Sequence, residues 1–515
     1  MTAFRRRRLI QTALAAAVLG ASGVAAAPAR SGGTLRAGLG GAHPSDSWDA
    51  RTHSDLFMIA AGQGAVFDTL TEVAADGSLR GELATGWEAS ADARVWTVTL
   101  REGVRFHNGT PFTARDVIAS LSLHLEPGTA SGARPLVETI AKMERLSDHR
   151  LRFTLAEGNA DFPYLLADYH LLIYPADQLE TAIAQGIGTG LYRVESFEPG
   201  RRFIGRRVEG HYKDGQAGWF DQIEFHALNN GAARVSALRS GQVDTISRVA
   251  PQRAAWLRAE PSLRLQDIPG NQYYGFAMQT GAAPFDALQI RQALKHAIDR
   301  QAILDRVLLG HGRIGADSPI GPANQYAADL AAPAFDPDRA RYHLKQAGLS
   351  SLTLPLSVSE AAFEGAPEAA ALFAESARAA GIEIAPVAEP AEGYWSEVWC
   401  NRPFSACAWS GRVTEDWMLS TQMRDGAPWN DTQWGMAQSP RFQALLLEAR
   451  AELDSARRRG LYGEMQQILR DEGGLLVPVF ANHLQAHSDR IATPGRIGTL
   501  WAMDNARFAE RWWRA

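Results

Sequence analysis

The fold is decided by the stretch SLTLPLSVSEAAFEGAPEAAALFAESARAAGIEIAPV, which spans residues 351–387. It begins and ends with apolar runs typical of strands, and residues Pro367 to Ala380 between them have a helical pattern that Gly381 closes. A strand, a helix and a second strand in this order predict parallel pairing through a crossover helix. The chain is therefore expected to be an α/β protein.

Segments on both sides extend this alternation. The run FSACAW (404–409) predicts the next strand, and VWTVTL (95–100) alternates apolar and polar residues with the period of a half-buried strand. Residues Asp286–Leu309 predict one long helix, and residues 439–472 predict a helical pair. We expect LLVPVF (475–480) to be the last clear strand.

The N-terminus has the pattern of an export signal. Four arginines, Arg5 to Arg8, precede a short apolar run and then small residues. The order of residues fits the twin-arginine route, although four arginines also suit the general secretory route. Cleavage after Ala26 or Ala29 satisfies the small-residue rule. The run is too short and too rich in alanine for a membrane anchor, so we expect a periplasmic protein with its signal peptide removed.

Composition and motifs exclude several functions. A net charge of -5 and 21% charged residues give no reason to expect nucleic acid as a partner. No lysine follows a glycine, so a Walker A loop is absent, and neither HExxH nor GxSxG occurs after the leader. The two cysteines, Cys400 and Cys407, are too few for a tetrahedral thiolate zinc site; they either pair in an oxidising compartment or belong to the core. We expect no catalytic residue, metal or cofactor.

The segment FSACAWSGRVTEDWMLSTQMRDGAPWNDTQW (404–434) is the candidate site. It combines four tryptophans with mixed charges and no long apolar run, which suits a loop that lines a cleft. The alternative is that the tryptophans fill a core or an interface between domains. In an open α/β sheet, ligands bind at the carboxyl ends of the strands. The part of this segment after Trp409 follows the carboxyl end of the predicted strand FSACAW.

The run GWEASADARVWTVTLREGVRFHNGTPFTARDVIASL (86–121) resembles the signature block of the family 5 extracytoplasmic solute-binding proteins, the dipeptide, oligopeptide and nickel receptors of ABC importers. Further matches follow in the same order along the chain: GTGLYRVESFEPG (188–200), PFDALQIRQALKHAIDRQAILDRVLLGHG (284–312) and WSGRVTEDW (409–417). The resemblance implies a type II periplasmic binding protein fold, with two lobes around a cleft and an extra domain.

Domain limits also follow from the resemblance. After an export signal at 1–29, lobe I is expected to combine residues 30–56, 178–270 and 482–515. Residues 57–177 are expected to form the extra domain, and residues 271–481 lobe II. Receptors of this family trap a solute between the lobes by hinge closure and deliver it to a membrane permease.

The signs of two charges depart from the peptide-binding members. There, the tryptophan matched by Trp409 is followed three residues later by an aspartate that pairs with the peptide amine, and this position holds Arg412. The arginine that meets the peptide carboxylate in dipeptide receptors is matched by Glu360. Because an unpaired buried charge is costly, an ordinary dipeptide is disfavoured. Alternatively, Arg412 pairs with Glu415 or Asp416 at the edge of the cleft.

We therefore expect a monomeric receptor that works with an ABC permease and ATPase. Trp409 is expected to form an apolar or stacking wall and Arg412 an anchor for an anion or hydroxyl. Trp429, Trp434, Tyr274 and Glu360 are expected to contact the solute as well. The solute is expected to be peptide-like, with opines, sugar phosphates and nickel or other metal chelates as alternatives. A secreted hydrolase with an unrecognised site is the competing function.

Overall fold

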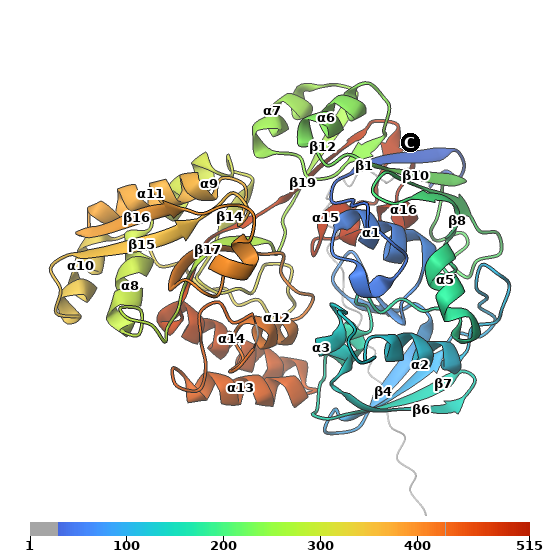
Figure 1. Cartoon of the computed structure of the whole chain (residues 1–515), viewed down its shortest axis with the longest axis horizontal. Helices are drawn as coiled ribbons and strands as arrows, with labels where there is room; N and C mark the ends of the chain where they lie inside the picture. The colour runs from blue at the N-terminus through green and yellow to red at the C-terminus, as the bar shows by residue number, and fades with distance from the viewer. Residues whose placement is uncertain (1–28, 428) are drawn as a thin grey trace, which may run out of the picture.

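The computed structural model describes residues 29–427 and 429–515. Apart from Ala29, the predicted export signal lies outside these ranges. No helix in the described part of the chain is both long and apolar enough to cross a membrane. Figure 1 shows two lobes joined at the top of the view, with a third domain below one of them.

The deciding stretch forms one edge of a six-stranded sheet. β15 and β16 pair in parallel from Leu352↔Ile382 to Val358↔Ala388, with α11 as the crossover helix between them, which confirms the predicted unit. β17 lies next to β15 in parallel, as FSACAW predicts. The strands, in order across the sheet, are β14 (Gly312–Ile314), β18 (Leu475–Ala481), β13 (Tyr273–Met278), β17 (Phe404–Trp409), β15 (Leu352–Val358) and β16 (Ile382–Ala388).

Helices pack on this sheet through one apolar core, which includes Phe276, Leu294, Phe373 and Phe404. They are α8 (Leu288–Ala297), α9 (Arg300–Arg306), α10 (Pro337–Gln346) and α11 (Ala366–Arg378). The prediction of one helix over 286–309 is wrong, because Ile298 is extended and Asp299 caps a second helix by accepting a hydrogen bond from the N–H of Ala302.

A seven-stranded sheet forms the core of the other lobe. β1 and β10 pair in parallel, and β9 and β8 continue the sheet in antiparallel order. Its order is β12 (Leu263–Ile268), β19 (His483–Ser488), β11 (Thr245–Ile246), β1 (Thr34–Leu39), β10 (Gln222–Ala227), β9 (Arg202–Arg207) and β8 (Tyr192–Glu198). β19 follows the strand over 475–481, so the prediction that LLVPVF is the last clear strand is wrong.

The third domain has a four-stranded antiparallel sheet, β4 (Ala84–Ala89), β5 (Val95–Leu100), β7 (Arg150–Leu155) and β6 (Ile140–Ser147). The alternation of VWTVTL is confirmed, since Trp96, Val98 and Leu100 are buried on one face. α2 (Ala114–Leu123) begins with a capping box in which Thr113 and Asp116 satisfy each other's backbone N–H. The domain limits predicted from the sequence remain a prediction.

The remaining short elements connect these sheets. Two small ribbons pair β2 (Thr71–Val73) with β3 (Leu79–Gly81) and β20 (Ile491–Ala492) with β21 (Trp513–Arg514). The helices and turns are η1 (Ala50–Thr52), α1 (Leu56–Ala61), η2 (Gly62–Val66), α3 (Arg134–Val137), α4 (Phe162–Leu165), η3 (Ala176–Gln178), α5 (Leu179–Gln185), α6 (Gly231–Arg239), α7 (Pro251–Ala259), η4 (Tyr394–Val398), α15 (Ala502–Asn505) and α16 (Phe508–Arg511).

Two chain crossings connect the seven-stranded and six-stranded sheets. β12 leads into β13, and β18 leads into β19 with only Asn482 between them. The crossings are held side by side, because the N–H of Ala481 donates to the carbonyl of Gln272 at 2.8 Å and the Asn482 amide donates to Asp267 at 2.6 Å. A narrow double connection of this kind is a suitable hinge.

The helical pair predicted over 439–472 is confirmed as α13 (Pro440–Ala451) and α14 (Ser455–Glu472). These helices extend from the six-stranded sheet to the third domain, as the lower part of Figure 1 shows. There the N–H of Ala160 donates to the carbonyl of Arg450 at 2.7 Å, and Arg458 pairs with Asp161 at 2.7 Å. The cleft between the lobes is therefore bridged on this side.

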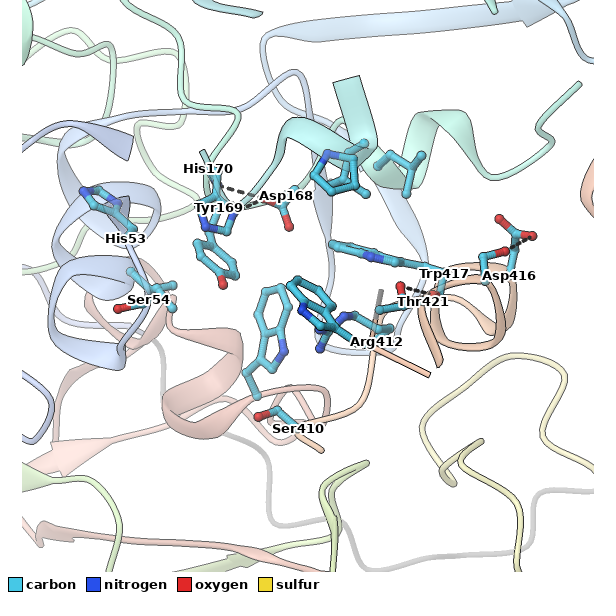
Figure 2. A pocket seen from close by; sticks show the side chains of 18 of the residues that line it. His53, Ser54, Asp168, Tyr169, His170, Ser410, Arg412, Asp416, Trp417 and Thr421 are labelled. Carbon is cyan, nitrogen blue, oxygen red and sulfur yellow. Dashed lines mark hydrogen bonds and ion pairs between the residues drawn. The ribbon is translucent and has the colours of Figure 1, made fainter. Parts of the chain in front are cut away.

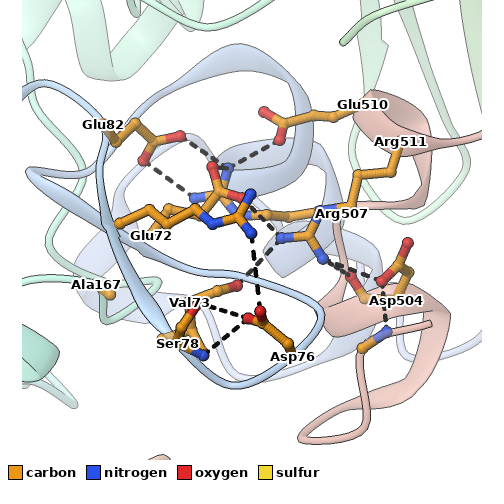
Figure 3. A network of polar contacts seen from close by, with 12 residues as sticks. Glu72, Val73, Asp76, Ser78, Glu82, Ala167, Asp504, Arg507, Glu510 and Arg511 are labelled. Atoms are coloured by element: carbon orange, nitrogen blue, oxygen red, sulfur yellow. Dashed lines mark hydrogen bonds and ion pairs between the residues drawn. The ribbon is translucent and has the colours of Figure 1, made fainter. Parts of the chain in front are cut away.

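A buried charge network fastens the C-terminal segment to the third domain (Figure 3). Arg507 Nη1 donates to Glu82 at 2.8 Å and to Glu510 at 3.0 Å, and Arg511 Nη2 donates to Glu72 at 2.7 Å. Glu82, Arg507 and Glu510 are all buried. Residues separated by more than 400 positions in the sequence thus complete one cluster.

Lys213 occupies the centre of the carboxylates in this network. Oxygens of Asp68, Glu82 and Glu510 lie within 4.8 Å of one another, and they form the one group in the described residues with the spacing for a metal ion. The Lys213 ammonium pairs with all three. Burial alone lowers the pKa of Lys213, but Glu510 and Glu82 raise it well above its ordinary value. The lysine thus provides the positive charge that a metal would otherwise supply.

Candidate binding cleft

A cleft of about 920 Å³ lies between the lobes. Its walls come from the segment around α1, from the third domain around α3 and residues 159–170, and from the segment that follows β17. Figure 2 shows Tyr169 and Asp168 on one side and Arg412 and Trp417 on the other. The polar and aromatic lining residues include Arg51, His53, Ser54, Asp55, Asp168, Tyr169, His170, Arg248, Ser410, Arg412, Asp416, Trp417, Thr421, Arg424, Trp429, Arg450, His483 and Trp501.

Arg412 projects into the cleft from the end of β17. The chain turns at Gly411, where φ is 79° and a Cβ would come within 2.5 Å of the Asn271 Cβ, so a side chain at 411 is excluded. The guanidinium carbon of Arg412 lies 5.4 Å from the centre of the Trp409 ring and 5.7 Å from that of Trp417. Two indole faces therefore hold the cation in place.

Arg412 has no acidic partner among the described residues. Within the described part of the chain, the only hydrogen bond of its guanidinium runs from Nη1 to the carbonyl of Gly411, at 2.9 Å. The alternative pairing with Glu415 or Asp416 does not occur, because Glu415 accepts the N–H of Tyr326 and Asp416 pairs with Arg450 at 3.2 Å. Burial lowers the pKa of Arg412. A half-buried cation without a counter-ion favours an anionic group in the cleft.

Trp409 supports this arrangement from behind the cleft. Its indole N–H donates to Asp431 Oδ2 at 3.2 Å, and the indole of Trp399 donates to the same oxygen at 3.2 Å. The Gln422 amide donates to Asp431 Oδ1 at 3.0 Å. Trp409 is 7% exposed and is not among the cleft-lining residues. Asp431 thus fixes the indole on which Arg412 lies.

The other predicted site residues separate into two groups. Trp429 is 41% exposed and lines the cleft. Trp434 is 1% exposed and packs against Phe442, and Tyr274 stacks on Phe363 with ring centres 4.4 Å apart, so neither ring lines this cleft. Glu360 lies away from the cleft and accepts the N–H of Gly365 at 2.8 Å.

Of the six predicted site residues, the structure therefore brings Arg412 and Trp429 to the cleft, with Trp409 directly behind Arg412. Their contact with a solute remains a prediction. The segment 404–434 is also more ordered than the predicted loop, since it contains α12 (Glu415–Gln422), capped by Thr414.

Several lining residues were missed by sequence reasoning. Trp417 belongs to the tryptophan-rich segment and lies under Arg412. Asp168, Tyr169 and His170 belong to the third domain and carry no motif, because their position in the cleft depends on how the domain packs. Trp501, near the C-terminal end, packs edge-on against Tyr169 at 5.6 Å. Apart from the contact of Trp417 with Arg412, these positions are not determined by local sequence.

The two cysteines are free thiols. Cys407 is fully buried on β17, and Cys400 has φ of 62°. Burial raises the pKa of Cys400 to about 12 and that of Cys407 well above its ordinary value, so neither thiol has the low pKa of a reactive cysteine.

Comparison with known proteins places these features in a family context. A sequence model of the bacterial extracellular solute-binding proteins, family 5, matches residues 78–431. The glutathione-binding protein GsiB of Salmonella typhimurium is 26% identical over 448 residues, with 84% of this chain and 86% of the relative covered. The di/tripeptide-binding protein 1 of Pseudomonas aeruginosa is 26% identical, with 91% and 93% covered. The structure of AgaA from A. tumefaciens R10 in complex with agropinic acid superposes with a TM-score of 0.77 at 23% identity, covering 94% of this chain and 99% of AgaA.

Proposed function

Because this chain belongs to the bacterial extracellular solute-binding proteins of family 5, we propose that it is the receptor of an ABC importer for a small solute with an acid group. The relatives named above are binding proteins for glutathione and for di- and tripeptides. The acid group is inferred from Arg412, a cation in the cleft that is held between two indoles and has no carboxylate partner among the described residues.

Capture by hinge closure follows from the position of the cleft. Its walls come from both lobes and from the third domain, and only two chain crossings connect the two large sheets. A solute that contacts both walls stabilises the closed form, because it loses half of its contacts when the cleft opens. Outside the cytoplasm, the receptor then delivers the solute to a membrane permease. No catalytic step is part of this proposal.

Binding of matched probes tests the role of Arg412. Calorimetric titration with glutathione, trialanine and agropinic acid should find at least one ligand. Arg412→Met should weaken it by 10-fold or more, the lower limit for a charged hydrogen bond. Arg412→Lys should retain part of the affinity, and Arg402→Met, which removes a surface arginine with a side chain 56% exposed, should change nothing.

Two results would contradict the proposal. The first is an affinity of Arg412→Met within twofold of the wild type while circular dichroism shows an intact fold. The second is equal binding of a probe and its carboxamide, since an anion anchor must distinguish them. Detectable cleavage of a bound peptide would instead favour the hydrolase alternative.

A further inference from the structure

Asp168 presents a second unexplained charge to the cleft. Its side chain is 1% exposed and lines the wall opposite Arg412. Oδ1 accepts the backbone N–H of His170 at 2.9 Å and its Nδ1–H at 2.6 Å. Oδ2 accepts no hydrogen bond from the described residues, and no lysine or arginine lies within 4.0 Å of the carboxylate. This oxygen is therefore available to a hydrogen-bond donor in the cleft.

Most other charges of the cleft are paired, and Asp425, which has no ion pair among the described residues, is exposed. Arg248 pairs with Asp55 at 2.6 Å, and Asp416 pairs with Arg450 at 3.2 Å. Arg51 pairs with Asp49 at 2.9 Å. Arg424, which also lines the cleft, lies at its rim, 44% exposed and 4.0 Å from Glu157. Asp168 is buried and Arg412 is half-buried, and neither has an oppositely charged arginine, lysine, aspartate or glutamate within 4.0 Å among the described residues.

Asp168 and Arg412 face the same space from different walls. In Figure 2 the Asp168 carboxylate and the Tyr169 ring point toward the side from which Arg412 enters. Tyr169 and Asp168, together with Tyr273, offset the effect of burial on the pKa of Arg412. The two charges are thus near enough to act on each other, yet they are not an ion pair.

We propose that Asp168 is the second anchor of the solute and accepts a protonated amine or another cationic N–H group, while Arg412 binds the acid group. This inference rests on the proposed function and deepens it, because it identifies the solute as a zwitterion. The cation then lies on the third-domain wall and the anion at the end of β17. One molecule bridging both walls stabilises the closed form more than an anion held by Arg412 alone.

Matched derivatives of two probes test this assignment. Glutathione and trialanine are titrated in three forms: unmodified, N-acetylated and as the C-terminal amide. In the wild type, acetylation should weaken binding by 10-fold or more. In Asp168→Asn the unmodified and acetylated forms should bind within threefold of each other, while the loss on amidation should persist. Arg412→Met should show the reverse pattern.

Controls separate a contact from a structural effect. Asp177→Asn removes a carboxylate of the third domain that is 76% exposed and far from the cleft lining, and it should keep the wild-type discrimination. If Asp168→Asn does not fold, Asp168→Ser replaces it. The comparison of acetylated and unmodified probes on the wild type needs no variant.

The outcomes distinguish the two proposals. A wild type that discriminates acid from amide but binds acetylated and free amines equally would overturn the role of Asp168 and leave that of Arg412. Discrimination against acetylation that survives in Asp168→Asn would also overturn it. A wild type that binds none of glutathione, trialanine and agropinic acid, or that ignores amidation of a bound probe, would overturn the proposed function itself.

Discussion

Asp161→Asn is the change that most directly tests how the cleft is held closed. Asp161 precedes α4 in the third domain, and its Oδ1 lies 2.7 Å from Nη1 of Arg458 on α14, with side chains 3% and 7% exposed. The Arg458 side chain is also held within its own lobe, since Nη2 donates to the Tyr462 hydroxyl at 3.2 Å. Opening the cleft therefore separates this pair and exposes both ions to water.

The magnitude follows from the distance and the burial. At 2.7 Å and an effective dielectric constant of about 20, the Coulomb attraction is about 6 kcal/mol. Desolvation of two buried ions offsets most of it. The net contribution is then that of a charged hydrogen bond, about 1.5–3 kcal/mol, or roughly 12- to 150-fold in the equilibrium between closed and open forms.

Two measurements check this value. Small-angle scattering of the ligand-free protein should show a larger radius of gyration for Asp161→Asn, and the affinity for the solute should fall by roughly the same factor as closure. Asp177→Asn is the matched control, because Asp177 pairs with Arg115 at 2.8 Å on the exposed surface. An unchanged radius together with an unchanged affinity would refute the reasoning, since the pair would then not contribute to closure.

Two further predictions concern buried carboxylates. Burial, and then repulsion from Asp161, raise the pKa of Glu415 from 4.5 to about 7. Between these pH values the folded protein keeps the proton and the unfolded chain loses it. The free energy of unfolding should therefore fall as pH rises from 4.5 to 7, by about 3 kcal/mol at most. In calorimetric melting, Glu415→Gln should lose less stability than the wild type over this range, and parallel curves would contradict the assignment. Asp431→Asn should shift the indole NMR signals of Trp399 and Trp409 and weaken binding of the acid probe; unchanged indole signals would show that Asp431 does not fix these rings.

Local patterns predicted the elements that depend on neighbours in sequence. The crossover unit at 351–387, the capping box at Thr113 and the helical pair over 439–472 are all present, because each is determined by periodicity or by a cap. The long helix over 286–309 failed for a local reason too. Asp299 can cap a new helix, and the apolar face continues across the break, so the pattern alone does not reveal it.

The cleft was less accessible to sequence reasoning, because its walls are contributed by different domains. Arg412 was identified through a resemblance, and its partners could not be assigned until Asp416 was seen to pair with Arg450. Trp434 and Trp409 belong to the same buried core, yet Trp409 lies behind the cleft cation and Trp434 packs against Phe442. Nothing in the run around Asp168 predicts that it faces Arg412.

The charge network at the C-terminal segment also has a consequence for biosynthesis. Glu72 and Glu82 are made early, but Arg507 and Arg511, which pair with them, are made more than 400 residues later. A nascent chain that lacks these arginines has only Lys213 among the described residues of this network to neutralise the buried acids, which destabilises the compact third domain. Maturation of that domain is therefore coupled to synthesis of the distant segment around Arg507, although domains usually fold one after another as they emerge.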